Sequence, residues 1–476
     1  MSIDLRIASL LFLSSLFLSA CSEGSRLSSD SYSPNLNLVA ANTVHPTPNL
    51  PNWARNANIY EVNIRQYTPE GTINAFARHL PRLKELGVDI LWLMPIFPIS
   101  TTKKKGALGS YYAVADYRSI NPAFGSAADF KALVEEIHRL EMKVILDWVP
   151  NHTGWDHHWI TEHPDWYTHD IQTDTILHPS DEKGKLTDWY DVAELNYDQS
   201  GLRQAMREAL EYWVKTYDID GYRMDVAFLV PQDFWTKTTA DLRKIKPLFL
   251  LAESATPAHR NSGSFDMNYG WAFHHLMNDI AKGEKQAVDI DKYLAAEREK
   301  HNKGFYMHFT SNHDENSWQG SVFDRMGAAH QALAVLAATI EGMPLIYSGQ
   351  EAALDRPLKF FEKDEINWSN YKYTIFYSTL LHLKKRNKAL WNGNFGGPVE
   401  RIVIKENKEI YAFTRVKDGD RVIVLLNLSE RPQQIRFSCP DCVGDYTNVF
   451  ANSTTTLTKE VTLRLSPWDF LVLSSN

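Results

Sequence analysis

The chain has 476 residues, of which 44% are hydrophobic, so it can hold one barrel-sized domain and a smaller second domain. Its 50 Lys and Arg residues stand against 58 Asp and Glu residues, with no basic run. This mildly acidic balance excludes nucleic acid and an anionic lipid surface as expected partners and favours a neutral ligand.

The N-terminal segment has the pattern of an export signal. Arg6 precedes an apolar run at residues 10–18 that is too short to cross a bilayer, so residues 1–20 are predicted to be a signal peptide. The sequence Leu18-Ser-Ala-Cys21 is similar to a bacterial lipobox, which predicts lipidation at Cys21 and a lipid anchor at the periplasmic side or the surface of a cell envelope. An ordinary cleavage site with a chance cysteine is the alternative. Residues 21–50, rich in Ser, Asn and Pro, are predicted to be a flexible spacer.

The next part of the chain alternates strand patterns with helix patterns. Apolar runs of strand length occur at 59–62, 90–93, 143–146, 221–224, 248–251, 264–266, 305–308 and 344–347. Amphipathic stretches at 128–141 and 202–217 have apolar residues three and four apart. The order predicts an α/β fold, a (β/α)8 TIM barrel over residues 51–391, whose site lies at the C-terminal ends of the strands.

Two regions depart from this alternation. Residues 148–196, after the third strand, are rich in Trp, His and Asp and are predicted to form an inserted domain. From residue 392 to 476 short alternating strands, including 410–413 and 421–426, predict a C-terminal all-β sandwich. Cys439 and Cys442 lie in this strand-rich region, which favours a structural disulfide over a redox or metal role.

Acidic side chains follow four of the predicted strands, at Asp147, Asp225, Glu253 and Asp314. Any one of them could merely cap the next turn. Four at the mouth of one barrel indicate a shared site, and the set suits cleavage of a glycosidic acetal, which needs one carboxylate to attack carbon and one carboxylic acid to protonate the leaving oxygen. Asp225 and Glu253 can fill these two roles.

The chain resembles the α-amylase family, glycoside hydrolase family 13, over most of its length. Four segments carry the resemblance in order, at 147–152, 221–225, 251–253 and 309–314, and further motifs lie at 87–95, 112–117, 121–125, 194–196 and 346–351. The resemblance implies that Asp225 is the nucleophile, that Glu253 is the acid and base, and that Asp314 stabilises the transition state. It also names residues 148–196 as the family's domain B.

The resemblance further implies a set of substrate-binding residues. Arg223, two positions before Asp225 and so on the same strand face, is expected to hold that carboxylate ionised. His152 and His313 are expected to donate hydrogen bonds to the sugar at the cleavage point, and Tyr112 is expected to stack under it. Asp355 and Arg356 are expected to bind the next sugar towards the non-reducing end. For the last two residues an exposed ion pair is the alternative. Asp147 is expected to organise the site.

Two departures from the family pattern concern the leaving-group side and the metal. Ala227-Phe228-Leu229 stands where many relatives have Lys-His, so that subsite must be built differently. No cofactor is required; a calcium ion is an open possibility, with Asn151 and Asp181 as candidate oxygen ligands. His157, His158 and His163 are loosely spaced for zinc, and no metal residue is assigned.

The sequence therefore predicts a retaining α-glucan hydrolase, an α-amylase that cleaves internal α-1,4 bonds of starch-like glucans and maltooligosaccharides. The alternatives are a cyclomaltodextrinase or neopullulanase, an α-1,6-glucosidase, or a glucanotransferase, all sharing the same catalytic residues. Val226, directly after the nucleophile candidate, resembles the residue at this position in several relatives that act on α-1,6 bonds. A catalytically silent sugar-binding protein would be expected to lose a carboxylate, and this chain keeps all three. The oligomeric state is left open.

Overall fold

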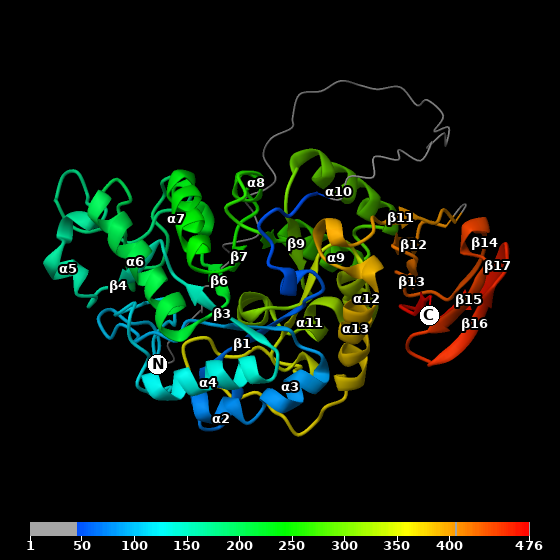
Figure 1. The fold of residues 1–476 in the computed structure, drawn as a ribbon, viewed down its shortest axis with the longest axis horizontal. Coiled ribbons are helices and arrows are strands. Elements are labelled where there is room, and N and C mark those ends of the chain that lie inside the picture. The colour runs from blue at the N-terminus through cyan, green and yellow to red at the C-terminus, as the bar shows by residue number, and fades with distance from the viewer. Residues whose placement is uncertain (1–44, 405–406, 476) are drawn as a thin grey trace, which may run out of the picture. The chain divides into compact units, whose positions relative to one another are not determined.

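A computed structural model describes residues 45–404 and 407–475, which belong to one compact unit (Figure 1). The predicted signal peptide, Cys21 and most of the predicted spacer lie outside the described residues. Within the described part of the chain, no helix is long and apolar enough to span a membrane.

Eight parallel strands close into a barrel, in the order β1-β10-β9-β8-β7-β6-β3-β2. This confirms the predicted α/β barrel. The strands are β1 (Ile59–Val62), β2 (Ile90–Leu93), β3 (Lys143–Trp148), β6 (Gly221–Met224), β7 (Phe249–Ala252), β8 (Met267–Tyr269), β9 (Phe305–His308) and β10 (Met343–Tyr347).

Alternate residues of each strand face opposite sides of the barrel wall. Ile59, Trp92 and Leu251 pack in the barrel interior, whereas Tyr60 and Leu91 pack in the cluster that includes the surrounding helices. The wall also needs a close approach of β6 and β7, because a Cβ atom on Gly221 would lie 1.9 Å from the Phe249 carbonyl oxygen. Only glycine, which has no Cβ atom, fits at that place in β6.

The helices cover the outside of the barrel and the loops. The longer helices are α3 (Leu80–Leu86), α4 (Ala127–Arg139), α6 (Ser200–Tyr217), α7 (Gln232–Ile245), α9 (Trp271–Ala281), α10 (Ala287–Lys300), α12 (His330–Thr339) and α13 (Thr374–Arg386). The short ones are α1 (Ile64–Tyr67), α2 (Ile73–Ala77), α5 (Trp159–Glu162), α8 (Pro257–Asn261) and α11 (Val322–Met326). The start of α4 shows how local sequence sets a boundary, since Ser126 and Asp129 form a reciprocal capping box there.

One strand prediction was wrong in its position. The run at 264–266 was expected to be the sixth strand, but β8 begins at Met267. The polar side chains before it bind elsewhere: the Asp266 carboxylate accepts hydrogen bonds from the Leu250 backbone and from Arg243, and Ser264 joins a cluster of hydroxyl groups. These bonds form a turn ahead of the strand, which a short apolar run in the sequence does not reveal.

The insertion after β3 and the C-terminal region are β-rich. In the insertion β4 (His152–Gly154) pairs antiparallel with β5 (Val192–Glu194). The C-terminal strands, orange to red in Figure 1, form a six-stranded sheet in the order β11-β12-β13-β18-β15-β16 and a two-stranded sheet of β14 and β17. Their bounds are β11 (Glu400–Arg401), β12 (Ile410–Lys417), β13 (Asp420–Asn427), β14 (Gln433–Ser438), β15 (Gly444–Asn448), β16 (Ser453–Leu457), β17 (Glu460–Leu465) and β18 (Phe470–Ser474). A disulfide joins Cys439 to Cys442 in the turn between β14 and β15, as the sequence predicted.

Candidate active site

The C-terminal ends of the barrel strands bring the predicted acidic residues to one place. Asp147 is the penultimate residue of β3, Asp225 directly follows β6, Glu253 directly follows β7, and Asp314 lies in the loop after β9. The side chains of Asp225 and Glu253 are 10% and 12% exposed, so a ligand can reach them. The Asp314 side chain is 34% exposed and borders the open side of the site.

Arg223 connects three of these carboxylates. Its Nη1 donates to Asp147 Oδ1 at 2.8 Å and to Asp225 Oδ1 at 2.7 Å, and its Nη2 lies 2.9 Å from Glu253 Oε2. Its Nε donates to the Tyr269 hydroxyl at 3.1 Å. The sequence predicted the contact between Arg223 and Asp225, but the structure extends it to Asp147 and Glu253. One buried guanidinium therefore fixes the relative positions of the nucleophile candidate and the acid candidate.

Burial and the guanidinium act in opposite directions on these acids. Burial raises the pKa of Asp225 well above its usual range, while Arg223 lowers it. Burial likewise raises the pKa of Asp147 to about 6 against the effect of Arg223. Glu253 Oε2 also accepts a hydrogen bond from the Val226 backbone N–H at 2.8 Å. Without Arg223 the ionised form of Asp225 would be much less stable, and a nucleophile must be ionised.

A second chain of contacts orients the sugar-binding candidates. The Tyr112 hydroxyl donates to Asp147 Oδ2 at 3.0 Å and lies 2.9 Å from His313 Nε2. The same imidazole nitrogen is 3.3 Å from Asp314 Oδ2, and the rings of Tyr112 and His313 stack with centroids 5.6 Å apart. Tyr112 and His313 thus join the same network as the four carboxylates.

Glu61 is a member of this network that the sequence reasoning missed. It is fully buried in β1, and its Oε1 forms a short hydrogen bond with His313 Nδ1. Burial alone would lower the pKa of His313, but the carboxylates of Asp314 and Glu61 raise it to about 9. The available signal was an acidic residue inside an otherwise apolar strand, two positions after the inward-facing Ile59.

Glu61→Gln is expected to make His313 lose its proton at a lower pH, because the substitution removes a negative charge beside the imidazole. The charged neighbours that remain include Asp314 and Asp147, which favour the cation, and Arg223, which opposes it. The alkaline limb of kcat/KM should then move to lower pH, since that profile reports the free enzyme. Glu351→Gln is the matched control: Glu351 is equally buried but contacts Tyr60 and Arg82 instead.

Glu61→Gln is also expected to lower the stability of the fold in a pH-dependent way. The pKa of His313 in the fold lies above its ordinary value of 6.5, so its protonation stabilises the fold fully below that pH and the contribution is lost as the pH rises through about 9. Glu61→Gln should therefore lower the free energy of unfolding more at pH 6 than at pH 10. An alkaline limb and a pH-dependence of unfolding identical to wild type would show that Glu61 does not control His313.

His152 and the candidate metal ligands do not join the network in the described residues. Burial lowers the pKa of His152 to about 3, so its imidazole is neutral, and its ring packs 5.9 Å from that of Trp189. Its Nδ1 is 3.4 Å from Asn151 Nδ2. The Asp181 carboxylate caps its own turn through two backbone N–H groups. His152 as a donor to the sugar stays a prediction.

In the described part of the chain, the acidic, histidine and cysteine side chains do not assemble a metal centre. Across residues 45–404 and 407–475, no group of three or more of them is placed to hold an ion. His157 accepts from the Trp159 backbone, His158 pairs with Glu162, and His163 stacks on Trp166. Calcium at Asn151 stays a prediction.

Asp355 and Arg356 lie in the loop after β10 and are exposed. The Arg356 guanidinium is 2.8 Å from Asp364 Oδ1 and donates to the Glu365 carbonyl at 2.9 Å. An ion pair was the alternative predicted for Asp355 and Arg356, but Arg356 pairs with Asp364. Sugar binding by Asp355 and Arg356 stays a prediction.

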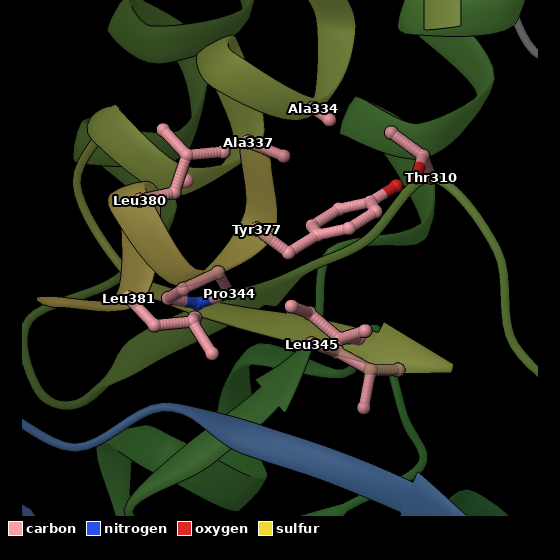
Figure 2. A pocket seen from close by; sticks show the side chains of 10 residues that line it. Thr310, Ala334, Ala337, Pro344, Leu345, Tyr377, Leu380 and Leu381 are labelled. Carbon is pink, nitrogen blue, oxygen red and sulfur yellow. The ribbon is translucent and has the colours of Figure 1, made fainter. Parts of the chain in front are cut away.

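A small apolar cavity lies on the helix side of the barrel wall, between β10, α12 and α13, and is separate from the acidic residues (Figure 2). Figure 2 shows the Tyr377 ring directed toward Thr310. Gln350 Nε2 donates to both hydroxyl groups, at 2.9 Å to Thr310 and 3.1 Å to Tyr377. These polar groups beside the cavity are thus hydrogen-bonded to one another, and none of them is a catalytic candidate.

Comparison with known protein families gives two matches. Residues 52–392 match the family model for the alpha amylase catalytic domain, and residues 401–472 match the model for the maltogenic amylase C-terminal domain. The first match covers the barrel with its insertion, and the second covers most of the C-terminal sheets.

Individual relatives agree with these matches. The alpha-amylase MalA of Haloarcula japonica is 26% identical over 409 residues, which are 81% of this chain and 57% of that enzyme, so the chain spans little more than half the length of that relative. The crystal structure of an alpha-amylase from Lactobacillus plantarum is 30% identical, with a TM-score of 0.77 over 89% of this chain and 100% of that one. The maltogenic alpha-amylase AmyB from Thermotoga neapolitana is 25% identical, with a TM-score of 0.78 over 88% of this chain and 98% of that one.

Proposed function

Because the chain belongs to the α-amylase family of glycoside hydrolases, we propose that it hydrolyses α-glucosidic bonds with retention of configuration. The observation that carries this proposal is the contact of one guanidinium, that of Arg223, with both Asp225 and Glu253. A retaining enzyme needs its two carboxyl groups only about 5–5.5 Å apart, and two acids bound to one guanidinium support that spacing.

The reaction takes two displacements. In the first, a carboxylate oxygen of Asp225 bonds to the anomeric carbon while the bond from that carbon to the glycosidic oxygen breaks, and Glu253 gives its proton to the departing oxygen. In the second, Glu253 takes a proton from water, whose oxygen displaces Asp225 from the carbon. Asp314 and His313 grip hydroxyl groups of the sugar that is distorted between these steps.

The finer specificity that we propose is of the maltogenic type, with release of maltose from maltooligosaccharides and cyclic glucans. The match of the C-terminal sheets to the maltogenic amylase domain and the likeness to AmyB support this choice. Cleavage at internal α-1,4 bonds of starch-like glucans, the first expectation from the sequence, is the competing specificity. Incubation with amylose, pullulan and cyclodextrin, followed by product analysis, separates the two: early maltose supports the maltogenic type, and a broad range of longer products supports internal cleavage. Glu253→Gln controls for contaminating enzymes.

The first product is expected to be the α-anomer, because two inversions at the same carbon give net retention. Proton NMR of fresh digests, recorded before mutarotation, measures this directly. Initial appearance of the β-anomer would mean direct attack by water, with Asp225 acting as a general base, and would refute the retaining mechanism.

We also propose export and lipid anchoring at Cys21 in a bacterial cell envelope, supported by the lipobox-like sequence 18–21 and the spacer pattern behind it. Cys21→Ala is expected to prevent lipid attachment and to release the chain from the membrane fraction. Intact-mass analysis of that fraction checks this, and a double variant, Cys439→Ala with Cys442→Ala, should keep the lipid. An unmodified, freely soluble wild-type chain would refute the anchor.

A further inference from the structure

Four aromatic rings continue from the active site to the protein surface. Tyr112 and Phe360 stack nearly parallel, with centroids 6.1 Å apart and planes at 11°. Trp318 lies 5.4 Å from Phe360 and 5.9 Å from Phe361. We call Tyr112, Trp318, Phe360 and Phe361 the aromatic rim. Its inner end is the residue that also bonds to Asp147 and His313.

The outer end of the rim is open to solvent. The large, mainly apolar ring of Trp318 is 54% exposed, so packing in the core does not explain its position. The residue lies in a π-helical turn, Glu315–Gln319, that follows Asp314 directly. Such turns are rare and occur frequently at functional sites.

Hydrogen bonds hold the rim together from three separate loops. Asn316 Nδ2 donates to the Arg356 carbonyl at 3.1 Å, and its Oδ1 accepts from the Leu358 backbone at 2.9 Å. The Leu108 N–H donates to the Phe361 carbonyl at 3.1 Å. The loops after β2, β9 and β10 are therefore tied to one another, so the exposed indole is presented on a fixed platform.

The position of the rim on the barrel assigns it to one side of the cleaved bond. In the closed strand order, β7, which Glu253 directly follows, is four places from β1 in either direction. The rim is built on the loops after β9, β10 and β2, which centre on β1 and its neighbours. The acid protonates the leaving oxygen, so it lies on the side of the departing sugars. The loops on the opposite side of the barrel therefore face the sugars that remain bound to the nucleophile, on the non-reducing side of the cleaved bond.

We propose that the aromatic rim binds glucose units on the non-reducing side of the cleaved bond, with Trp318 as the outermost contact. This rests on the proposed function. The chemistry fits, because the rings offer neutral apolar faces to the C–H faces of sugars and Trp318 lies beyond the sugar held at Tyr112. The rim thereby sets a preference for substrates with more than one sugar on that side.

Chain-length dependence tests the proposal. Trp318→Ala is expected to lower the ratio of kcat/KM for maltopentaose to kcat/KM for α-glucosyl fluoride by about tenfold, since a one-sugar donor does not extend to the outer ring. Trp318→Phe should restore part of the ratio. Tyr371→Ala is the matched control: Tyr371 is an exposed ring, 41% accessible, packed on Trp368 and Arg82 outside the rim, and its loss should leave the ratio unchanged.

Bond-cleavage frequencies on maltopentaose labelled at its reducing end test the assigned side. Loss of a contact on the non-reducing side should shift cleavage toward bonds nearer the non-reducing end. A shift in the opposite direction, or a ratio that does not change in Trp318→Ala, would overturn the proposal. A wild-type chain that cleaves no α-glucan at all would instead overturn the proposed function.

Discussion

Asp225→Asn, Glu253→Gln and Asp314→Asn are each expected to lower turnover by at least about a thousandfold, because the three side chains act as a unit in the same chemical steps. Asp225 would form the bond to carbon, Glu253 would protonate the leaving oxygen, and Asp314 would hold the distorted sugar. Turnover of maltooligosaccharides by the purified variants measures the loss, with freshly prepared protein so that deamidation does not restore the acid.

Asp220→Asn is a matched control for this series. Asp220 is buried, like Asp225, and directly precedes β6, whereas Asp225 directly follows it, so the two acids lie at opposite ends of one strand. Asp220 pairs with His138, Lys143 and Lys246. Its amide variant should lose stability but keep turnover in the folded fraction. Near-normal activity of Asp225→Asn would remove the proposed mechanism.

Arg223→Met should cost both stability and activity. The substitution leaves Asp147, Asp225 and Glu253 close together without the cation that links them. Removing one partner of a buried ion pair destabilises a fold by about 3–5 kcal/mol, and some of that cost is relieved when the acids take up protons. Because Arg223 lowers the pKa of Asp225 against the effect of burial, its loss should move the acidic limb of kcat/KM to higher pH. Denaturant unfolding and a pH profile measure the two effects.

Arg243→Met is the control that separates the loss of stability from the shift of the acidic limb. Arg243 forms a similar pair with the buried Asp266, at 3.1 Å, just before β8 begins and so at the other end of the barrel. This variant should unfold more easily than wild type but keep the acidic limb in place. If Arg223→Met lost stability without any movement of the acidic limb, Arg223 would be only a structural residue.

The sequence by itself determined the barrel and the positions of its main acids. Apolar runs of four residues separated by amphipathic helices specify strands with two buried faces, so β1, β2, β6 and β9 were predicted with the bounds that the structure has. Strand ends in such a barrel share one rim, and Asp147, Asp225, Glu253 and Asp314 therefore had to meet there. Local spacing also predicted the contact of Arg223 with Asp225, since residues two apart share a strand face.

Only the tertiary structure decided which partners those residues have. The contacts of Arg223 with Asp147 and Glu253, the hydrogen bond of Glu61 to His313 and the ring contact of Trp318 with Phe360 each join segments distant in the chain. Local pattern carries no information about such pairs, because barrel closure and loop packing set their distances. The start of β8 was missed for the same reason, since Arg243, from α7, holds the Asp266 carboxylate in the turn before the strand. Sequence thus specified the elements and their ends, and closure of the barrel specified the electrostatic network.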